Sequence, residues 1–442
     1  MGLDTLSFSF LFLPALLLVF SVLPEKYRNG SLAAGSLLFY ALADYQHLPL
    51  MFCSVLFDYL VCAKMVRSSG EMKGRKILFW ISVIKNIGLI LTMMTLMELY
   101  KIPLPLGLLV YTTTSMGYVI DVYNGDEQFD GSFVNYLVFS SFFAKLYAGP
   151  IVRYSDLKKQ WENRDLSGKR IWQACRLYLG GLGKIVLLAR GNIEIQTAIQ
   201  QIPQEDTSVL SVWLLIITST FALYYTLTGY CDMARGLGNF FGMDFPENFH
   251  HPFQSRTVSD FFNRFNITVT QFINRYVYVF LGADTNGVLP TAVNTLLTTM
   301  LMGLWFGIRL NYLVWGIYFT GFILLEKYFL MKYLKKIPPI FDRIYTFIVV
   351  MFSFTIFSGR SLSVTGYYIA GMFGMSGLPL YNNYISYILS SNYLTVLLSF
   401  FFATGLTGMA EQFVRSKMPW LFRVLDAAVY TGIFIASVAF LV

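Results

Sequence analysis

Long apolar runs separated by short polar connections dominate the chain. A helix needs about 20 residues to cross the hydrocarbon core of a bilayer, and apolar runs near this length recur along the whole sequence. The pattern predicts helices over residues 5–23, 31–47, 49–66, 77–99, 103–123, 133–150, 170–190, 208–229, 259–281, 289–308, 310–331, 344–359, 390–409 and 421–442. Residues 133–150 and 259–281 are too polar or too broken to span simply, which favours re-entrant or interfacial helices. We therefore predict an all-α membrane protein with about eleven to thirteen helices that cross or enter the bilayer.

The composition supports this interpretation. Of the 442 residues, 56% are hydrophobic and only 13% are charged, whereas a soluble domain carries about 25% charged residues. No polar stretch is long enough to form a separate soluble domain, so residues 1–442 are predicted to form a single membrane domain. The four cysteines lie in apolar runs without metal-ligand spacing, and we expect no metal site.

The net charge of +8 bears on orientation and not on nucleic acid. Basic residues of membrane proteins collect in cytoplasmic loops and contact anionic lipid head groups, so membrane lipid is the expected partner. No soluble basic surface interleaved with aromatic residues is present, which excludes nucleic-acid binding. Four basic clusters mark the loops expected to be cytoplasmic: Lys64, Arg67, Lys73, Arg75 and Lys76; Lys158, Lys159, Arg164, Lys169 and Arg170; Lys332, Lys335, Lys336 and Arg343; and Arg415, Lys417 and Arg423.

Several motifs occur in a fixed order along the chain. They are YTTTSMGYVIDVYNG at 111–125, AGPIVRYSDL at 148–157, TGYCDMARGLGNFFG at 228–242, PENF at 246–249 and the segment 311–326. This series resembles the membrane-bound O-acyltransferase (MBOAT) family, particularly bacterial members that acylate alginate, cellulose or teichoic acid. The resemblance covers about residues 30–330 and leaves the helices of 344–442 as a C-terminal addition.

The resemblance implies a multi-helix bundle with a central tunnel in the bacterial inner (plasma) membrane. An acyl donor such as acyl-CoA or an acyl carrier protein would enter from the cytoplasm, and an acceptor would be met from the outer side. No resident cofactor is implied. A protein partner in an envelope polysaccharide acylation or secretion assembly is expected.

Two positions depart from the family pattern. Asn266 stands where the family carries a histidine in a segment like FWRRWHISLS, and Phe306 stands where a second histidine is found in GLWHG. Phe319 replaces a further histidine. A base with a pKa near the operating pH removes the acceptor proton best, and histidine is the side chain that meets this condition. An amide can orient a group by hydrogen bonds but cannot accept that proton, and a phenyl ring can do neither.

Other side chains are candidates for the site. His250 and His251, about fifteen residues upstream, are candidates to replace the missing base, although interfacial histidines are the commoner interpretation. Charges in apolar runs are expensive and are either paired or functional. The candidates for the lining of the tunnel or the substrate site are Arg153, Asp232, Arg235, Asn263, Arg264, Trp305 and Asn311. Arg153, Arg264 and Lys145 are the first cations to test for phosphate contact.

Three functions remain open from the sequence. A catalytically altered homologue would act as a scaffold or as a lipid- or acyl-binding component of envelope polysaccharide O-acylation or export. An active O-acyltransferase would pass an acetyl group across the membrane to an extracellular polysaccharide or to a partner acetyltransferase. A transporter would move a lipid-linked substrate without covalent change.

Overall fold

The computed structural model describes residues 1–68, 72–203, 206–282, 287–359, 361–375 and 377–442. Contacts divide the chain into two compact units. The first contains Met1–Gly181 and Tyr230–Glu247 with Leu441, and the second contains Leu182–Gly229 and Asn248–Phe440 with Val442. Each unit is described by itself. Positions 283 and 284, which end the segment 246–284 that carries the PENF motif and Asn266, lie outside the described residues.

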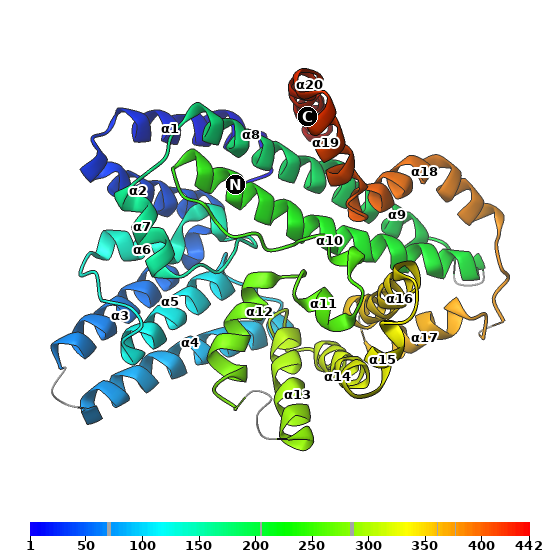
Figure 1. Ribbon diagram of the computed structural model, residues 1–442, viewed down its shortest axis with the longest axis horizontal. Helices are drawn as coiled ribbons and strands as arrows, with labels where there is room; N and C mark the ends of the chain where they lie inside the picture. The colour runs from blue at the N-terminus through cyan, green and yellow to red at the C-terminus, as the bar shows by residue number, and fades with distance from the viewer. Residues whose placement is uncertain (69–71, 204–205, 283–286, 360, 376) are drawn as a thin grey trace. The chain divides into compact units, whose positions relative to one another are not determined.

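The first unit is built from helices that follow one another closely in sequence. Its elements are η1 (Phe8–Phe12), α1 (Leu13–Val22), α2 (Glu25–Asp44), η2 (Tyr45–His47), α3 (Leu48–Arg67), α4 (Met72–Tyr100), α5 (Leu108–Asn124), α6 (Phe133–Ser141), η3 (Phe143–Lys145), α7 (Tyr154–Glu162), α8 (Gly168–Gly183) and the C-terminal part of α10 (Val209–Phe240). Helices α3, α4 and α5 lie side by side in this unit (Figure 1). The basic cluster of 158–170 falls on α7, on the connection that follows it and on the first turn of α8.

A buried polar network joins α3 to α4. Asp58 is fully buried, and its carboxylate accepts hydrogen bonds from Lys85 Nζ at 2.8 Å and from Ser82 Oγ at 2.6 Å. Asn86 Nδ2 donates to the same carboxylate at 3.1 Å, and Lys85 Nζ also donates to Ser54 Oγ at 2.9 Å. The charges are thus paired and hydrogen-bonded, which is the condition under which ionised groups are tolerated inside an apolar bundle.

The second unit contains the remaining helices. Its elements are η4 (Lys184–Ala189), α9 (Arg190–Gln200), the N-terminal part of α10, η6 (Pro252–Gln254), α11 (Val258–Phe262), α12 (Ile267–Ile273), η7 (Asn274–Tyr278), α13 (Val288–Leu304), α14 (Leu310–Leu325), η8 (Glu326–Leu330), α15 (Met331–Leu334), α16 (Pro339–Ser358), α17 (Leu362–Met372), α18 (Asn383–Ala403), α19 (Leu406–Lys417) and α20 (Pro419–Leu441). Within the described part of the chain there is no named strand, and Phe249 and Phe265 form an isolated antiparallel bridge.

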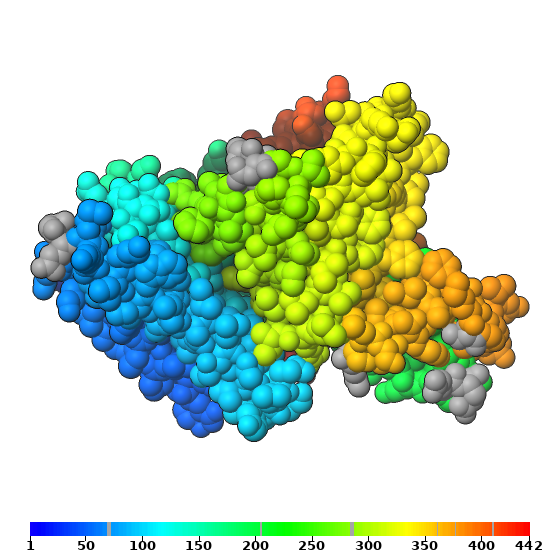
Figure 2. All heavy atoms as spheres, turned by 90° about the horizontal axis from the view of Figure 1, so that it is seen from below, coloured from blue at the N-terminus to red at the C-terminus, as the bar shows by residue number. Residues whose placement is uncertain are grey.

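Helices α13 and α14 pack closely because glycines face the partner backbone. A Cβ on Gly303 would lie 2.1 Å from the carbonyl oxygen of Tyr312, and one on Gly316 would lie 2.7 Å from Cα of Met300. Small residues permit this approach between membrane helices. The atoms of α13 and α14 form one continuous yellow-green surface in Figure 2. The pair positions the segment that carries Phe306 and Trp315.

Seven helical runs among the described residues are long and apolar enough to cross a membrane. They are Glu25–Arg67, Met72–Tyr100, Val209–Phe240, Leu310–Leu334, Pro339–Ser358, Asn383–Ala403 and Pro419–Leu441, and the first of them contains both α2 and α3. The prediction of an all-α membrane protein is confirmed. The larger number of helices that enter the bilayer, the single membrane domain and the division into 30–330 and 344–442 stay predictions.

The predicted helix boundaries differ from the structure at several places, among them the end of α10, which runs to Phe240 and not to residue 229. The run predicted over 390–409 is two helices, because Gly405 between α18 and α19 adopts a left-handed conformation with φ 67°. The run over 133–150 ends as an α-helix at Ser141, and the run over 259–281 is interrupted between Phe262 and Ile267. Helices α7, α9 and α17 were not predicted, because their 9, 11 and 11 residues are too few for a pattern based on spanning length.

Candidate functional site

The segment that carries Asn266 is held by a buried asparagine from the PENF motif. Asn248 is 3% exposed, and its Nδ2 donates to Asn266 Oδ1 at 3.0 Å. Its Oδ1 accepts from the backbone N–H and the hydroxyl of Thr268 at 2.9 and 3.0 Å. Asn266 precedes α12 in a left-handed conformation, with φ 51° and ψ 50°, which asparagine and histidine tolerate better than most residues do. Asn248 therefore fixes both the amide of Asn266 and the start of α12.

Backbone hydrogen bonds join the two arms of this segment. The N–H of Ile267 donates to the Asn248 carbonyl at 2.9 Å, and the N–H of His250 donates to the Arg264 carbonyl at 2.9 Å. Between them, the rings of Phe249 and Phe265 meet edge to face at 5.0 Å. Two backbone hydrogen bonds and one ring contact thus fix the backbone of this loop.

Asn266 and Phe306 line the same small pocket, although they lie on different segments of the chain. The pocket has a volume of only about 10 Å³, about the space that one water needs. Its lining residues are Phe262, Phe265, Asn266, Val269, Thr270, Met302, Phe306 and Trp315. The two positions at which the motif resemblance predicts histidine therefore line one pocket of this unit, which aromatic side chains almost fill.

Aromatic rings surround the Phe306 side of this pocket. Phe306 meets Phe357 at 4.9 Å and Trp315 at 6.5 Å between ring centroids. The fully buried Phe319 lies against Trp315 at 4.7 Å and against Phe262 at 4.8 Å. The indole Nε1 of Trp315 is buried and has no hydrogen-bond partner among the described residues. The surroundings of Phe306 are therefore apolar, apart from the buried N–H donor of Trp315.

The histidines proposed as replacements do not line the pocket. His250 and His251 lie next to each other at 5.4 Å between ring centroids, and neither is among the lining residues. The ring of His251 faces α19, where a Cβ on Gly405 would lie 2.8 Å from its Nδ1. A direct role for either histidine as base at Asn266 gains no support from this arrangement.

Four of the charged candidates are ion-paired. Arg264 Nε lies 2.8 Å from Asp260 Oδ1 on the preceding turn. In the first unit, Arg235 lies 3.6 Å from Asp232, and Arg153 Nε lies 3.3 Å from Asp121. These contacts are what internal pairing of charges in an apolar bundle requires.

The remaining tunnel candidates have varied surroundings. Asn263 is exposed, and Trp305 is half-buried. Asn311 is buried, and its Nδ2 donates to the carbonyls of Ile356 and Gly359 at 3.0 Å each. Asn311 thereby ties the start of α14 to the end of α16. The assignment of these residues to a tunnel stays a prediction.

Sequence reasoning singled out Asn266 and Phe306 but missed the role of Asn248. The PENF motif pointed to the segment, yet nothing in the pattern indicates that an asparagine 18 positions earlier supports Asn266. From the sequence, Trp315 is expected only as an aromatic residue of the tunnel mouth or the membrane interface. A signal for its pocket position would have required the spatial pairing of α13 with α14.

A buried glutamate anchors the start of α11. Glu326 is fully buried, and its carboxylate accepts hydrogen bonds from the N–H groups of Val258 at 2.7 Å and Ser259 at 3.3 Å. Negative charge is favoured at the N-terminal end of a helix, where N–H groups lack partners within the helix. Glu326 therefore connects η8 to the segment that leads to Asn266.

Replacement of Glu326 by alanine is expected to lower the free energy of unfolding by about 3 kcal/mol, because two hydrogen bonds to a charged acceptor are lost. Glu326→Gln keeps the volume and one acceptor oxygen, so it should lose about half as much. Unfolding of the detergent-solubilised variants measures both. An alanine variant as stable as the unaltered chain would show that the carboxylate does not anchor α11.

Comparison with known proteins identifies the family to which the chain belongs. The family model described as MBOAT, membrane-bound O-acyltransferase family, matches residues 128–369. The "Probable alginate O-acetylase AlgI" of Pseudomonas fluorescens is 30% identical over 372 residues, which are 83% of this chain and 74% of that protein. The chain belongs to the MBOAT family. The prediction from the sequence motifs is confirmed.

Other relatives of this MBOAT protein carry related names. The "Peptidoglycan O-acetyltransferase" of Helicobacter pylori is 26% identical over 426 residues, covering 85% of this chain and 80% of that protein. The "Teichoic acid D-alanyltransferase" of Bacillus subtilis is 28% identical over 245 residues, covering 51% and 61% respectively. The chain is therefore a multi-pass membrane protein, and these relatives are named for the acylation of alginate, peptidoglycan or teichoic acid. The replacement of the family histidines stays a prediction from the motifs.

Proposed function

We propose that this MBOAT protein is a catalytically altered member that serves envelope polysaccharide O-acylation or export as a scaffold or as a lipid- or acyl-binding component. The observation that supports this is the pocket shared by Asn266 and Phe306. None of its lining residues has a side chain that titrates near neutral pH. A proton leaving an acceptor hydroxyl would find no base there, and general acid–base help is worth about 10²–10⁴-fold in rate.

On this proposal the protein has a defined membrane location and a protein partner. The protein lies in the inner membrane, with its basic loops in the cytoplasm. It works beside a protein partner of the acylation assembly. Where an acyl donor is bound, a thioester of coenzyme A or of an acyl carrier protein fits the family resemblance. The aromatic lining of the Phe306 side suits an acyl chain or lipid better than it suits a sugar hydroxyl.

A second candidate is an active O-acyltransferase. The similarity to proteins named alginate O-acetylase and peptidoglycan O-acetyltransferase over more than four fifths of the chain favours it. On this alternative, a group outside the pocket of Asn266 would have to take the proton.

Complementation in the source organism separates the two functions. A strain without the protein should lose O-acyl esters from its envelope polysaccharide. If the chain is a non-catalytic component, Asn266→Ala and Phe306→Leu should both restore the ester content to within about twofold of the unaltered chain, since neither residue handles a proton. Ester release from purified polysaccharide measures the content, and immunoblotting of membranes shows that each variant is present.

The opposite outcome would overturn the proposal. If Asn266→Ala is present at normal levels but leaves about tenfold less ester, Asn266 takes part in the chemistry. If the ester content falls because the Asn266→Ala variant is lost from the membrane, the result reports a folding defect. The ester content of the Phe306→Leu strain then decides between the two functions. Normal ester content in the strain without the protein would exclude both candidate functions.

A further inference from the structure

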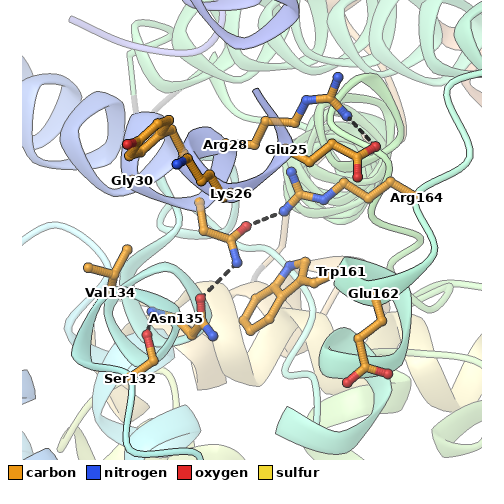
Figure 3. Close-up of a pocket in the computed structure, with 12 residues that line it drawn as sticks. Glu25, Lys26, Arg28, Gly30, Ser132, Val134, Asn135, Trp161, Glu162 and Arg164 are labelled. Atoms are coloured by element: carbon orange, nitrogen blue, oxygen red, sulfur yellow. Dashed lines mark hydrogen bonds and ion pairs between the residues drawn. The ribbon is translucent and has the colours of Figure 1, made fainter. Parts of the chain in front are cut away.

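The first unit contains a pocket that the acyl-transfer motifs do not involve. It lies between the first turns of α2, the start of α6 and the connection from α7 to α8, and its volume is about 430 Å³ (Figure 3). Its lining residues are Glu25, Lys26, Tyr27, Arg28, Asn29, Gly30, Ser132, Val134, Asn135, Trp161, Glu162 and Arg164. The lining is rich in hydrogen-bond donors, and Arg28 and Arg164 enter it from segments far apart in the sequence.

The two guanidinium groups share one side of this pocket. Figure 3 shows Arg28 and Arg164 near each other, with the Trp161 indole below Arg164. Both guanidinium groups also lie over the ring of Phe20, at 5.4 and 5.3 Å from its centroid. Arg28 has an acidic neighbour in Glu25 at 3.5 Å, but the Glu25 side chain is 90% exposed and such pairs are worth little. The positive charges of Arg28 and Arg164 are thus held close together, with little negative charge nearby to balance them.

Arg164 is held in place by amides. One of its terminal nitrogens donates to Asn29 Oδ1, and Asn29 Nδ2 in turn donates to Asn135 Oδ1 at 2.8 Å. Burial and the neighbouring charge of Arg28 lower the pKa of Arg164 to about 10. The guanidinium group stays charged at neutral pH. A bound anion would offset both the cost of burying this charge and its repulsion by Arg28.

Several buried donors in this pocket lack acceptors. Arg28 Nε, Arg164 Nε and Nη1, and Trp161 Nε1 are buried without a hydrogen-bond partner among the residues that the structure describes. Buried donors require an acceptor from water or from a ligand, and the positive charge favours an anion. Guanidinium groups offer paired N–H donors that match the oxygens of a phosphate.

The position of the pocket restricts the kind of anion. Trp161 and Arg164 lie in the basic segment 158–170, which the positive-inside rule places at the cytoplasmic surface. The phosphates of lipid head groups lie at this level, and soluble phosphate esters reach it from the cytoplasm. Lys159 and Lys169 on the same segment are exposed and add to the positive potential without lining the pocket.

We propose that Arg28, Arg164 and Trp161 form a phosphate-binding site that takes the phosphate ester of a membrane lipid head group or of a coenzyme A-type acyl donor. The proposal does not depend on whether the chain is catalytic. It also differs from the sequence-based choice of cations. Arg153 and Arg264 are paired with acids, and the fully buried Lys145 donates to the carbonyl of Phe139.

Binding in a phosphate-free maltoside detergent tests the site with matched probes. Coenzyme A is compared with pantetheine by titration calorimetry, and phosphatidylglycerol is compared with diacylglycerol by retention in native mass spectrometry. The variant is Arg28→Gln with Arg164→Gln. The control is Lys159→Gln with Lys169→Gln, which removes the same charge from the same surface. We expect at least one phosphate-bearing probe to bind about tenfold tighter than its counterpart, and the arginine variant to lose that preference.

The outcomes separate the sources of the phosphate. Preference for coenzyme A alone identifies a soluble donor, and preference for phosphatidylglycerol alone identifies a lipid. Inorganic phosphate should compete with either. Trp161→Phe removes one donor and should weaken binding several-fold, which keeps the test decisive if the arginine variant does not fold. The proposal is wrong if no phosphate-bearing probe is preferred, or if the lysine control loses as much affinity as the arginine variant.

Discussion

Histidine at both positions 266 and 306 is expected to raise acyl transfer by about 10²–10⁴-fold over the unaltered chain, because it restores a base and an assisting group where the two positions meet. Both side chains line the same pocket, so the two imidazoles would lie close together. The backbone at Asn266, with φ 51°, is a conformation that histidine tolerates. Phe306→His replaces one planar ring by a smaller one, which limits the steric cost within the aromatic group.

Release of thiol from an acetyl thioester, together with transfer of labelled acetyl to polysaccharide, measures this gain. The single variants Asn266→His and Phe306→His should each give less than the double variant. Asn266→Gln with Phe306→Leu is the matched control, since it changes the same positions without adding a titrating group. The gain should rise with pH through the imidazole range near about 6.5, because only the neutral ring accepts a proton. A folded double-histidine variant with no more transfer than the matched control would mean that the absence of imidazole at these two positions does not limit acyl transfer by this chain.

Lys85→Met should lower the free energy of unfolding by about 3–5 kcal/mol, because it leaves the fully buried Asp58 without its cation. The carboxylate must then either remain charged in an apolar bundle or take up a proton, and either change costs free energy. Ser82 and Asn86 also donate to this carboxylate, so the loss would reach the whole contact between α3 and α4.

A double variant separates the pair from the packing. Asp58→Asn with Lys85→Met removes both charges and should recover at least half of the loss, because no uncompensated charge remains. Lys101→Met is the exposed control, since Lys101 lies 4.0 Å from Glu98 with its side chain 75% exposed, and it should change stability by less than about 1 kcal/mol. Unfolding in detergent monitored by circular dichroism measures each value. If Lys85→Met matches the Lys101 control, the ion pair does not hold α3 against α4.

The apolar pattern was enough to predict the long helices, but neither their ends nor the short helices between them. Spanning runs are read from composition over about 20 residues, so the average character of a segment decides. The break at Gly405 depends on one left-handed residue, and a Cβ there would lie 2.5 Å from Gln254 Nε2 and 2.8 Å from His251 Nδ1. Gln254 and His251 belong to a segment that is distant in the sequence. The run over 390–409 was therefore predicted as one helix.

The chemistry of the candidate site was predictable in kind but not in arrangement. The motif order led to Asn266 and Phe306, since each stands where the resemblance predicts histidine, whose role follows from its pKa. The charged candidates could not be sorted in the same way. Whether Arg264 is paired depends on Asp260, which lies 2.8 Å away, and no motif marks Arg28 near the start of α2.

The sequence by itself determined that this protein is an integral membrane protein and that it is an MBOAT protein. It also determined that an amide and a phenyl ring stand where imidazoles are expected. All three conclusions depend only on the identity and order of the residues. Only the tertiary structure decided that Asn266 and Phe306 share one pocket, that Lys85 neutralises Asp58, and that Arg28 and Arg164 converge. Asn29 and Arg164, which meet in that last pocket, are 135 positions apart. Contacts of that kind depend on how helices pack, and a linear pattern does not contain the packing.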